Sequence, residues 1–327
     1  MGDRSGIEWT DATWNPVTGC TKVSPGCDNC YAASIAHRFA GTPAYPQGFT
    51  VTLRPERLVI PLRWTRPRRV FVNSTSDLFH NQIEDRFIAQ VWAVMACAPR
   101  HTFQVLTKRH ARLRALLSDP TFEAMVLEAV DQLRLPAPLP GTPVPVLPLP
   151  NVWIGVSAEN QQWADIRVPN LLATPAAVRF VSAEPLLGPI RLTGRHETCP
   201  QHPDHSTRAC SCARRAGLDW LIVGGESGPA ARPMNPRWVS DLRDDATTGG
   251  VAFLFKQWGE WAPPPGGSGR ATVLPDGVVM TRVGKKTAGR LLEERVWDQY
   301  PSPSPAHPGQ PLSDSPQEPP CSATPTH

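Results

Sequence analysis

Short runs of β-branched and other large apolar residues recur along the chain, and each run ends in a cluster of polar residues. Residues 70–72, for example, lead into Asn-Ser-Thr-Ser-Asp at 73–77, and residues 220–223 lead into Gly-Gly-Glu-Ser at 224–227. Short apolar runs bounded by polar residues are typical of buried strands. We predict the other strands at 103–106, 152–156, 178–181 and 251–255, with a first strand near 13–18.

Helical patterns occupy several of the gaps between these runs. Apolar side chains recur on one face over 86–98, further helices are indicated at 110–117 and 121–133, and another opens near 235–236. Alternating strands and helices predict an α/β fold with parallel strands and right-handed crossovers. The number of strands favours a parallel β/α barrel-like fold of the TIM type, full or partial. An open doubly wound sheet would show the same local pattern, so the pattern does not choose between the two.

Three proline-rich stretches divide the chain. Residues 136–150 contain seven prolines and are expected to form an extended connection within the main domain, which spans 1–262. The run at 263–267 separates that domain from a short C-terminal extension at 263–300. Residues 301–327 contain nine prolines and almost no large apolar residue, so this tail is expected to be disordered.

Composition and charge exclude several classes of protein. The 327 residues carry a formal net charge of +4, which is too small to require a nucleic-acid partner. No apolar stretch is long enough to span a bilayer, and the N-terminus lacks the basic and apolar segments of a secretory signal. We therefore expect a cytoplasmic protein without membrane contact. In a reducing compartment the eight cysteines point to metal binding rather than to disulfides.

Cys20, Cys27 and Cys30 follow the predicted first strand with the spacing C-x6-C-x2-C. Three thiolates from one short loop can hold three irons of a 4Fe-4S cluster and leave the fourth iron open for a ligand. Residues 31–39 read as a helix, which places Cys30 near a helix N-terminus, where the helix dipole favours a thiolate. The alternative is a structural zinc ion whose fourth ligand is a side chain such as His37 or His80.

A second group of potential ligands lies in a polar, Cys/His-rich insertion at 194–216. Its spacing matches no standard zinc finger, but the ligands are dense. We predict a structural zinc site there, formed from Cys199, either His202 or His205, Cys210 and Cys212. An unliganded loop is the alternative. Cys97 ends an apolar helix and is expected to be a small buried hydrophobic residue.

Seven segments carry a resemblance to a known family. They include Gly-Cys-Thr-Lys-Val-Ser-Pro-Gly-Cys-Asp-Asn-Cys-Tyr at 19–31, Leu-Thr-Lys-Arg at 106–109 and Ser-Ala-Glu-Pro at 182–185, and the others are 7–16, 153–157, 224–228 and 255–259. On these segments the chain resembles a phage-associated family of unknown function. The three-cysteine motif of that family is similar to that of radical SAM enzymes, in which the usual spacing is C-x3-C-x2-C.

The similarity to radical SAM enzymes implies a reaction type. The open iron would bind S-adenosyl-L-methionine (SAM), and an electron from the cluster would release a 5′-deoxyadenosyl radical that removes hydrogen from a substrate. The side chains expected to bind SAM are Ser74, Ser76, Asp77, Lys108, Arg109 and Asn160. Those expected to act in catalysis are Glu159, Glu184, Glu226 and Lys256. The alternative for any one of them is a structural role, as a helix cap or an ion-pair partner.

Glu226 belongs to a Gly-Gly-Glu sequence, which in radical SAM enzymes follows the second strand and binds the SAM amine. Here the sequence follows the sixth predicted strand. That role is therefore not transferred, and Glu226 is expected only to point into the site.

The sequence favours an iron–sulfur enzyme of the radical SAM type that acts on an unknown substrate. Basic groups at 63–69 and 108–114, and at Arg214 and Arg215, suggest a nucleic acid or a nucleotide as this substrate. A solvated charged surface is the alternative interpretation of these groups. A non-catalytic, zinc-dependent nucleic-acid-binding protein is the alternative. The resemblance also implies a dedicated protein partner.

Overall fold

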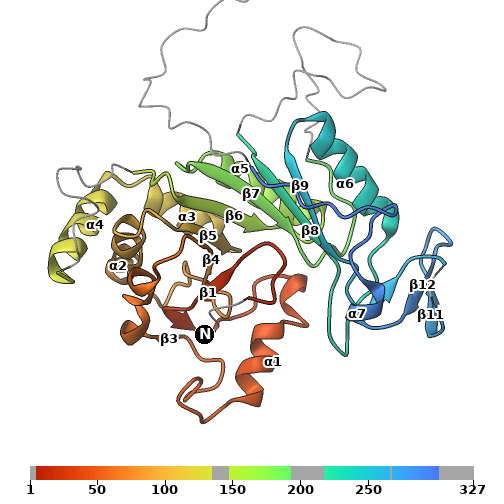
Figure 1. Ribbon diagram of the computed structural model, residues 1–327, viewed down its shortest axis with the longest axis horizontal. Coiled ribbons are helices and arrows are strands. Elements are labelled where there is room, and N and C mark those ends of the chain that lie inside the picture. Colours follow the sequence, from red (N-terminus) through yellow and green to blue (C-terminus); the bar gives the residue numbers. More distant parts are fainter. Residues whose placement is uncertain (1–4, 135–146, 193–216, 266, 302–327) are drawn as a thin grey trace, which may run out of the picture.

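The computed structural model describes residues 5–134, 147–192, 217–265 and 267–301 (Figure 1). Most of the proline-rich connection, Arg214, Arg215 and residues 302–327 of the predicted tail lie outside these ranges. The predicted zinc ligands also lie outside them: Cys199, His202, His205, Cys210 and Cys212. Within the described ranges, no helix is long and apolar enough to cross a membrane.

The centre of the fold is a sheet of seven parallel strands. In chain order they are β1 (Ala12–Trp14), β4 (Arg69–Val72), β5 (Thr102–Thr107), β6 (Val152–Ser157), β7 (Val178–Ala183), β8 (Trp220–Gly224) and β9 (Ala252–Gln257). The strand predictions are confirmed to within a few residues, because buried parallel strands appear in a sequence as continuous apolar runs.

The order of the strands decides between a barrel and an open doubly wound sheet. Each strand pairs with the next strand along the chain, from β1 to β9 without a reversal. A doubly wound sheet instead reverses its strand order at a switch point. The sheet curls as a half-barrel with helices alternating between its strands (Figure 1). The predicted barrel-like fold is therefore confirmed in its partial form.

Helices connect most of these strands, close to their predicted positions. They are α1 (Tyr31–Arg38), α2 (Asp85–Ala96), α3 (His110–Leu117), α4 (Pro120–Gln132), α5 (Gln161–Leu172) and α6 (Pro236–Thr248), with three short 3-10 helices, η1 (Pro25–Cys27), η2 (Pro55–Arg57) and η3 (Ile60–Arg63). The sequence pattern does not predict α5. Pro169 lies inside this helix, and one of its three buried residues is Arg167, so its apolar periodicity is weak.

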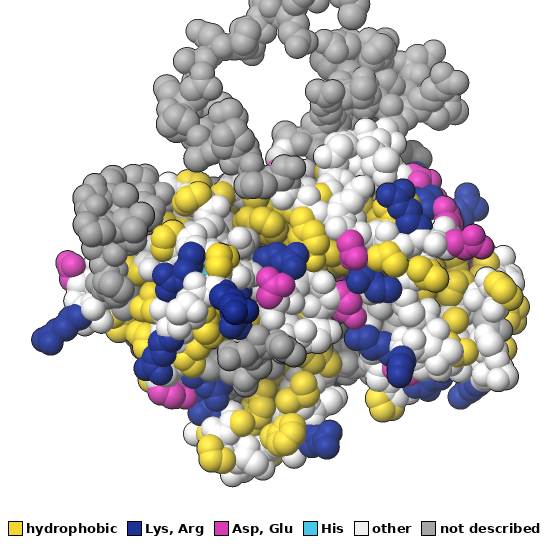
Figure 2. Space-filling model, in the orientation of Figure 1, with side chains coloured by type: hydrophobic (Ala, Val, Ile, Leu, Met, Phe, Trp, Pro, Cys, Tyr) yellow, Lys and Arg dark blue, Asp and Glu magenta, His cyan; other side chains and the backbone are white. Residues whose placement is uncertain are grey.

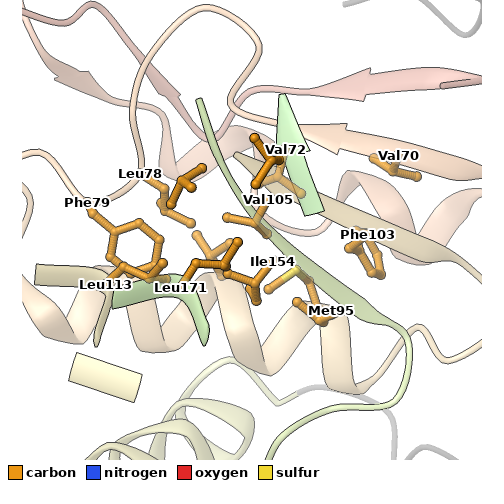
Figure 3. Packing of buried hydrophobic residues seen from close by; sticks show 14 of the residues in the cluster. Val70, Val72, Leu78, Phe79, Met95, Phe103, Val105, Leu113, Ile154 and Leu171 are labelled. Carbon is orange, nitrogen blue, oxygen red and sulfur yellow. The ribbon is translucent and has the colours of Figure 1, made fainter. Parts of the chain in front are cut away.

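The convex face of the sheet packs against the helices. Val72, Val105 and Ile154 come from three neighbouring strands and belong to one buried cluster with Met95 of α2 and Leu113 of α3 (Figure 3). All five side chains are at most 2% exposed. This cluster is the main hydrophobic core, and it holds the strands in their curved arrangement.

Aromatic side chains fill the concave face toward the amino ends of the strands. The ring of Trp9, which precedes β1, lies 6.1 Å from that of Trp220 and 6.3 Å from that of Phe180. The same buried cluster includes Phe71, Trp153, Val178, Ile222 and Leu254. Gly155 leaves room for this packing, because a Cβ atom there would lie 2.4 Å from the ring of Phe180. Polar side chains therefore gather at the carboxyl ends of the strands.

The predicted first strand at 13–18 is two separate strands. Residues 12–14 form β1 in the main sheet, whereas β2 (Val17–Thr18) pairs in an antiparallel manner with β3 (Thr52–Leu53). β2 leads the chain from β1 into the three-cysteine segment, which lies between the two paired strands in the sequence.

The residues that follow β9 form a small sheet, whose first strand begins just before the predicted extension at 263–300. A three-stranded antiparallel sheet is formed by β10 (Trp261–Ala262), β11 (Arg270–Val273) and β12 (Val279–Arg282), and α7 (Lys285–Ala288) follows. The chain then runs along the free edge of β9, where Phe255 N donates to Trp297 O at 3.0 Å and Gln299 N donates to Phe253 O at 3.1 Å. This pairing covers one edge of the half-barrel.

We expect Gly155→Ala to destabilise the protein by about 1–3 kcal/mol, because the added methyl group overpacks the aromatic cluster against Phe180. The urea midpoint of unfolding measures this effect. Gly6→Ala is the matched control, since a Cβ atom at Gly6 meets no atom within 4 Å. Equal midpoints for the two variants would contradict the prediction.

Candidate functional site

The segment 19–30, which we call the cysteine loop, lies over the carboxyl ends of the strands. Gly19 forms a bridge with Ser76, just beyond β4, and Cys20 N donates to Phe49 O at 3.2 Å. Gly19 adopts φ +86°, and a Cβ atom there would lie 2.2 Å from Thr50 O, so only glycine fits. At the other end of the loop Cys30 is the N-cap residue of α1, as predicted.

The three thiols of the loop are free and partly buried. Arg109 Nη2 lies 3.9 Å from Cys20 Sγ, and Ser24 Oγ lies 3.9 Å from Cys27 Sγ. Burial raises the pKa of Cys20 to about 11, an effect that Asp77 reinforces and Arg109 only partly offsets. A metal that binds this sulfur must therefore displace its proton.

A fully buried carboxylate, that of Glu159, holds the middle of the loop from below. Ser24 Oγ donates to Glu159 Oε1 at 2.6 Å, and Arg167 Nη1 lies 3.0 Å from Glu159 Oε2. Lys108 Nζ also contacts Oε1. The loop approaches this carboxylate closely at Gly26, where a Cβ atom would lie 2.4 Å from Glu159 Cγ.

The surroundings of Glu159 favour the ionised carboxylate by lowering its pKa. Burial by itself raises the pKa, but the charges of Lys108 and Arg167 and the hydrogen bonds from Lys108 and Ser24 outweigh burial and lower it. Glu159 is therefore an anion that lies against the cysteine loop and does not face an open space.

A second buried carboxylate, that of Glu226, holds the far side of the loop. Arg232 donates to it from Nη2 at 2.6 Å and from Nε at 2.9 Å, and Asn29 Nδ2 donates at 3.1 Å. The same guanidinium donates to Pro25 O at 2.9 Å and lies 3.5 Å from Asp28 Oδ2. Residues on both sides of Cys27 are thus fixed to the end of β8.

Arg109 fixes the end of the cysteine loop that carries Cys20. Its Nη2 donates to Thr21 Oγ1 at 2.9 Å and to Thr21 O at 3.3 Å. Asp77, which lies 3.9 Å from Arg109 Nε, accepts from Thr107 Oγ1 at 2.7 Å and from Lys108 N at 3.0 Å. This network ties the end of β4 to the end of β5, directly beneath Cys20.

Three of the predicted SAM-binding residues make structural contacts. Ser74 Oγ donates to Asn15 Oδ1 at 3.1 Å, and Ser76 Oγ donates to Val17 O at 2.9 Å. Asn160 is the N-cap residue of α5, and its side chain accepts from a backbone N–H of the first turn. These contacts are of the kind that the alternative interpretation describes.

Two of the predicted catalytic residues form an ion pair that water reaches. Lys256 Nζ lies 2.5 Å from Glu184 Oε1, and their side chains are 14% and 19% exposed. Gly224 adjoins the pair, since a Cβ atom there would lie 3.3 Å from Glu184 Cδ. The structure therefore places this pair, unlike Glu159, where a ligand could reach it.

Most of the partners of the two buried carboxylates were not among the predicted site residues. Ser24, Asn29, Arg167 and Arg232 were not predicted as site residues, yet each contacts Glu159 or Glu226. Two signals were present in the sequence. Arg167 lies within a stretch that must pack on a sheet, and Ser24 and Asn29 lie between the cysteines.

The basic groups do not form one surface around the loop. Residues 63–68 precede β4 and Arg69 begins it, so this group lies at the amino end of the strand, opposite the cysteine loop. Arg68 stacks over Trp64 at 5.1 Å. Arg112 pairs with Asp85 at 2.5 Å. On the face shown in Figure 2, Lys and Arg side chains are scattered among acidic and hydrophobic ones.

Three free thiols on one loop are donors that an iron–sulfur cluster or a zinc ion can use. Among the described residues, no three His, Cys, Asp or Glu side chains lie close enough together to bind one metal ion. His80, one proposed fourth ligand, has its Nε2 atom 2.9 Å from Thr21 Oγ1. A cluster places each cysteine on a different iron, so the thiols need not meet at one point. Free thiols are the donors that such a cluster uses, and the clamped loop carries three of them.

Comparison with known proteins gives a family but no activity. The chain belongs to the family described as "Protein of unknown function (DUF5131)", which it matches over residues 4–301. The resemblance to a family of unknown function is thereby confirmed. No curated protein and no solved structure matches the chain.

Arg232→Met should loosen the cysteine loop, because it removes the donor to Pro25 O and the two side-chain donors to the buried Glu226. We expect the free energy of unfolding to fall by about 1–3 kcal/mol and hydrogen exchange to be faster at the amides of 26–30. Arg243→Met is the matched control, since Arg243 pairs with Glu293 away from the loop. Unchanged exchange in Arg232→Met would contradict the clamp.

Stability should fall in acid because of Glu226. Burial raises its pKa, but hydrogen bonds from Arg232 and Asn29 hold the pKa below the ordinary value of 4.5. The unfolded chain therefore binds more protons, so the contribution of Glu226 is present above that value and is lost as the pH falls toward the folded pKa. Urea unfolding as a function of pH should show a shallower acid slope for Glu226→Gln than for the wild type. Equal slopes would refute this.

Proposed function

We propose that this member of the DUF5131 family is an iron–sulfur enzyme of the radical SAM type. In this proposal Cys20, Cys27 and Cys30 hold a 4Fe-4S cluster with one open iron, and SAM is the ligand of that iron. The observation that carries the proposal is the position of the cysteine loop. It presents three free thiols at the carboxyl ends of a parallel half-barrel, clamped by two buried carboxylates.

The position of the loop supports a catalytic rather than a structural cluster. In parallel β/α barrels the reacting groups come from the carboxyl ends of the strands. A cluster with an open iron, when bound, supplies a site for the SAM amine and carboxylate and an electron that yields the 5′-deoxyadenosyl radical. The similarity of the three-cysteine motif to that of radical SAM enzymes supports SAM as this ligand.

The residues of the chain divide the remaining tasks. Glu159 and Glu226 orient the cysteine loop, since each accepts hydrogen bonds from it. Lys256 and Glu184 remain partly exposed at the strand ends and are placed to contact a polar ligand or substrate. The aromatic cluster around Trp9 and Trp220 closes the concave face below them. This closed face keeps water out, and a reactive radical requires that water be excluded.

Anaerobic reconstitution with iron and sulfide tests the proposal. We expect a 4Fe-4S cluster by Mössbauer and EPR spectroscopy, and a change in the EPR spectrum of the reduced cluster when SAM is added. Replacing any one of Cys20, Cys27 and Cys30 with Ala should abolish stable cluster binding. Cys97→Ala is the control, because Cys97 is buried at the end of α2, outside the loop.

Two outcomes would contradict the proposal. Purified protein that holds zinc alone and takes up no iron with acid-labile sulfide would favour the zinc-dependent alternative. Normal iron binding by the triple Cys→Ala variant would remove the cysteine loop as the metal site.

A further inference from the structure

We propose that the buried triad of Glu159, Lys108 and Arg167 raises the reduction potential of the cluster held by the cysteine loop. The inference rests on the proposed function, since it requires a cluster at this position. It gives Glu159 and Lys108 a role different from direct contact with SAM or substrate.

The triad carries one more positive charge than negative charge. It contains one carboxylate and two cations, and the side chains of Glu159 and Arg167 are 0% exposed while that of Lys108 is 17% exposed. Arg167 is only partly paired, because Nη1 donates to Ser157 O at 2.8 Å and to Glu159, whereas Nε and Nη2 have no hydrogen-bond partner among the described residues. Solvent therefore does little to screen this excess charge.

The triad is in direct contact with the loop that carries the ligands. Ser24 Oγ lies 2.6 Å from Glu159 Oε1 and 3.9 Å from Cys27 Sγ, so one hydroxyl group separates the carboxylate from a ligand sulfur. Gly26 adds a second contact, since its lack of a side chain lets the backbone lie against Glu159 Cγ. The charges therefore act on the cluster over a short distance through buried protein.

The sign of the effect follows from the charge of the redox step. A low-potential one-electron donor passes one electron to the cluster, whose core charge falls from 2+ to 1+. A net positive charge in a medium of low dielectric constant stabilises this added negative charge. Charge and hydrogen bonding near the sulfurs are among the factors that set cluster potentials. The two cations should therefore raise the potential, and Glu159 should lower it.

Other charged groups near the loop largely balance one another. Asp77 lies 3.9 Å from Arg109, and Arg232 lies 2.6 Å from Glu226 and 3.5 Å from Asp28. Asp28 also lies 3.7 Å from Lys22, so the three carboxylates of these pairs are matched by three cations. The triad beneath Ser24 and Gly26 is the group with an unbalanced charge, so its members are the ones whose replacement should be visible.

An anaerobic redox titration with dithionite, followed by EPR of the reduced cluster, tests the proposal. Lys108→Met and Arg167→Met should shift the midpoint potential to more negative values, and Glu159→Gln should shift it to more positive values. Arg167→Lys, which keeps the charge, should restore a potential close to that of the wild type. Arg179→Met is the matched control, because this half-buried arginine donates to Thr174 O at the amino end of β7, away from the loop.

Shifts of the midpoint potential in opposite directions distinguish an electrostatic role from a purely structural one. A purely structural role would change the stability of the protein without producing such opposite shifts. Shifts of the same sign in all three charge-changing variants, or unchanged potentials in all of them, would overturn the proposal. Loss of the cluster from all three would also overturn it and assign the triad to the folding of the loop. If the wild-type protein assembles no cluster, the proposed function itself fails, and the two failures are thus distinguishable.

Discussion

A buried carboxylate must be neutralised, and this requirement couples the cysteine loop to the sheet. Glu159 and Glu226 lie just beyond the ends of β6 and β8, and both are buried. Each takes one partner from the loop and at least one cation from elsewhere in the fold, and for Glu159 these are Ser24, Lys108 and Arg167. An unpaired charge in such a position would cost several kcal/mol. If the loop moved away, these charges would become exposed to solvent or would stay buried without a partner.

The half-barrel provides the frame for this arrangement because its concave face is closed toward the amino ends of the strands. Residues from the two ends of the described chain meet there. Tyr300 lies beside Trp220, with ring centroids 5.2 Å apart, and its hydroxyl group donates to Glu8 O at 3.4 Å. Arg69 stacks over the same tyrosine ring. With that side filled, the carboxyl ends are left as the place where polar groups and a cofactor can gather.

Local sequence patterns predicted most of the helices and strands, but they predicted the roles of the charged residues less well. The strand at β6 and the helix α3 follow from apolar runs and periodicity, which are properties of neighbouring residues. The helix α5 was missed because Arg167 and Pro169 interrupt its apolar pattern. Arg167 is buried where it pairs with Glu159 and donates to Ser157 O. Glu159 lies only eight residues before Arg167, but an apolar pattern does not show that two charged residues will be buried together where α5 packs on β6.

The sequence by itself determined the alternation of strands and helices and the three-cysteine spacing, because both depend on residues close together in the chain. Only the tertiary structure decided that the sheet is a half-barrel, and which strand-end charges hold the loop. Ser24 and Glu159 are 135 residues apart, and Asn29 and Glu226 are 197 residues apart. Contacts across such separations arise from the order in which the strands pair, and that order is a property of the folded chain.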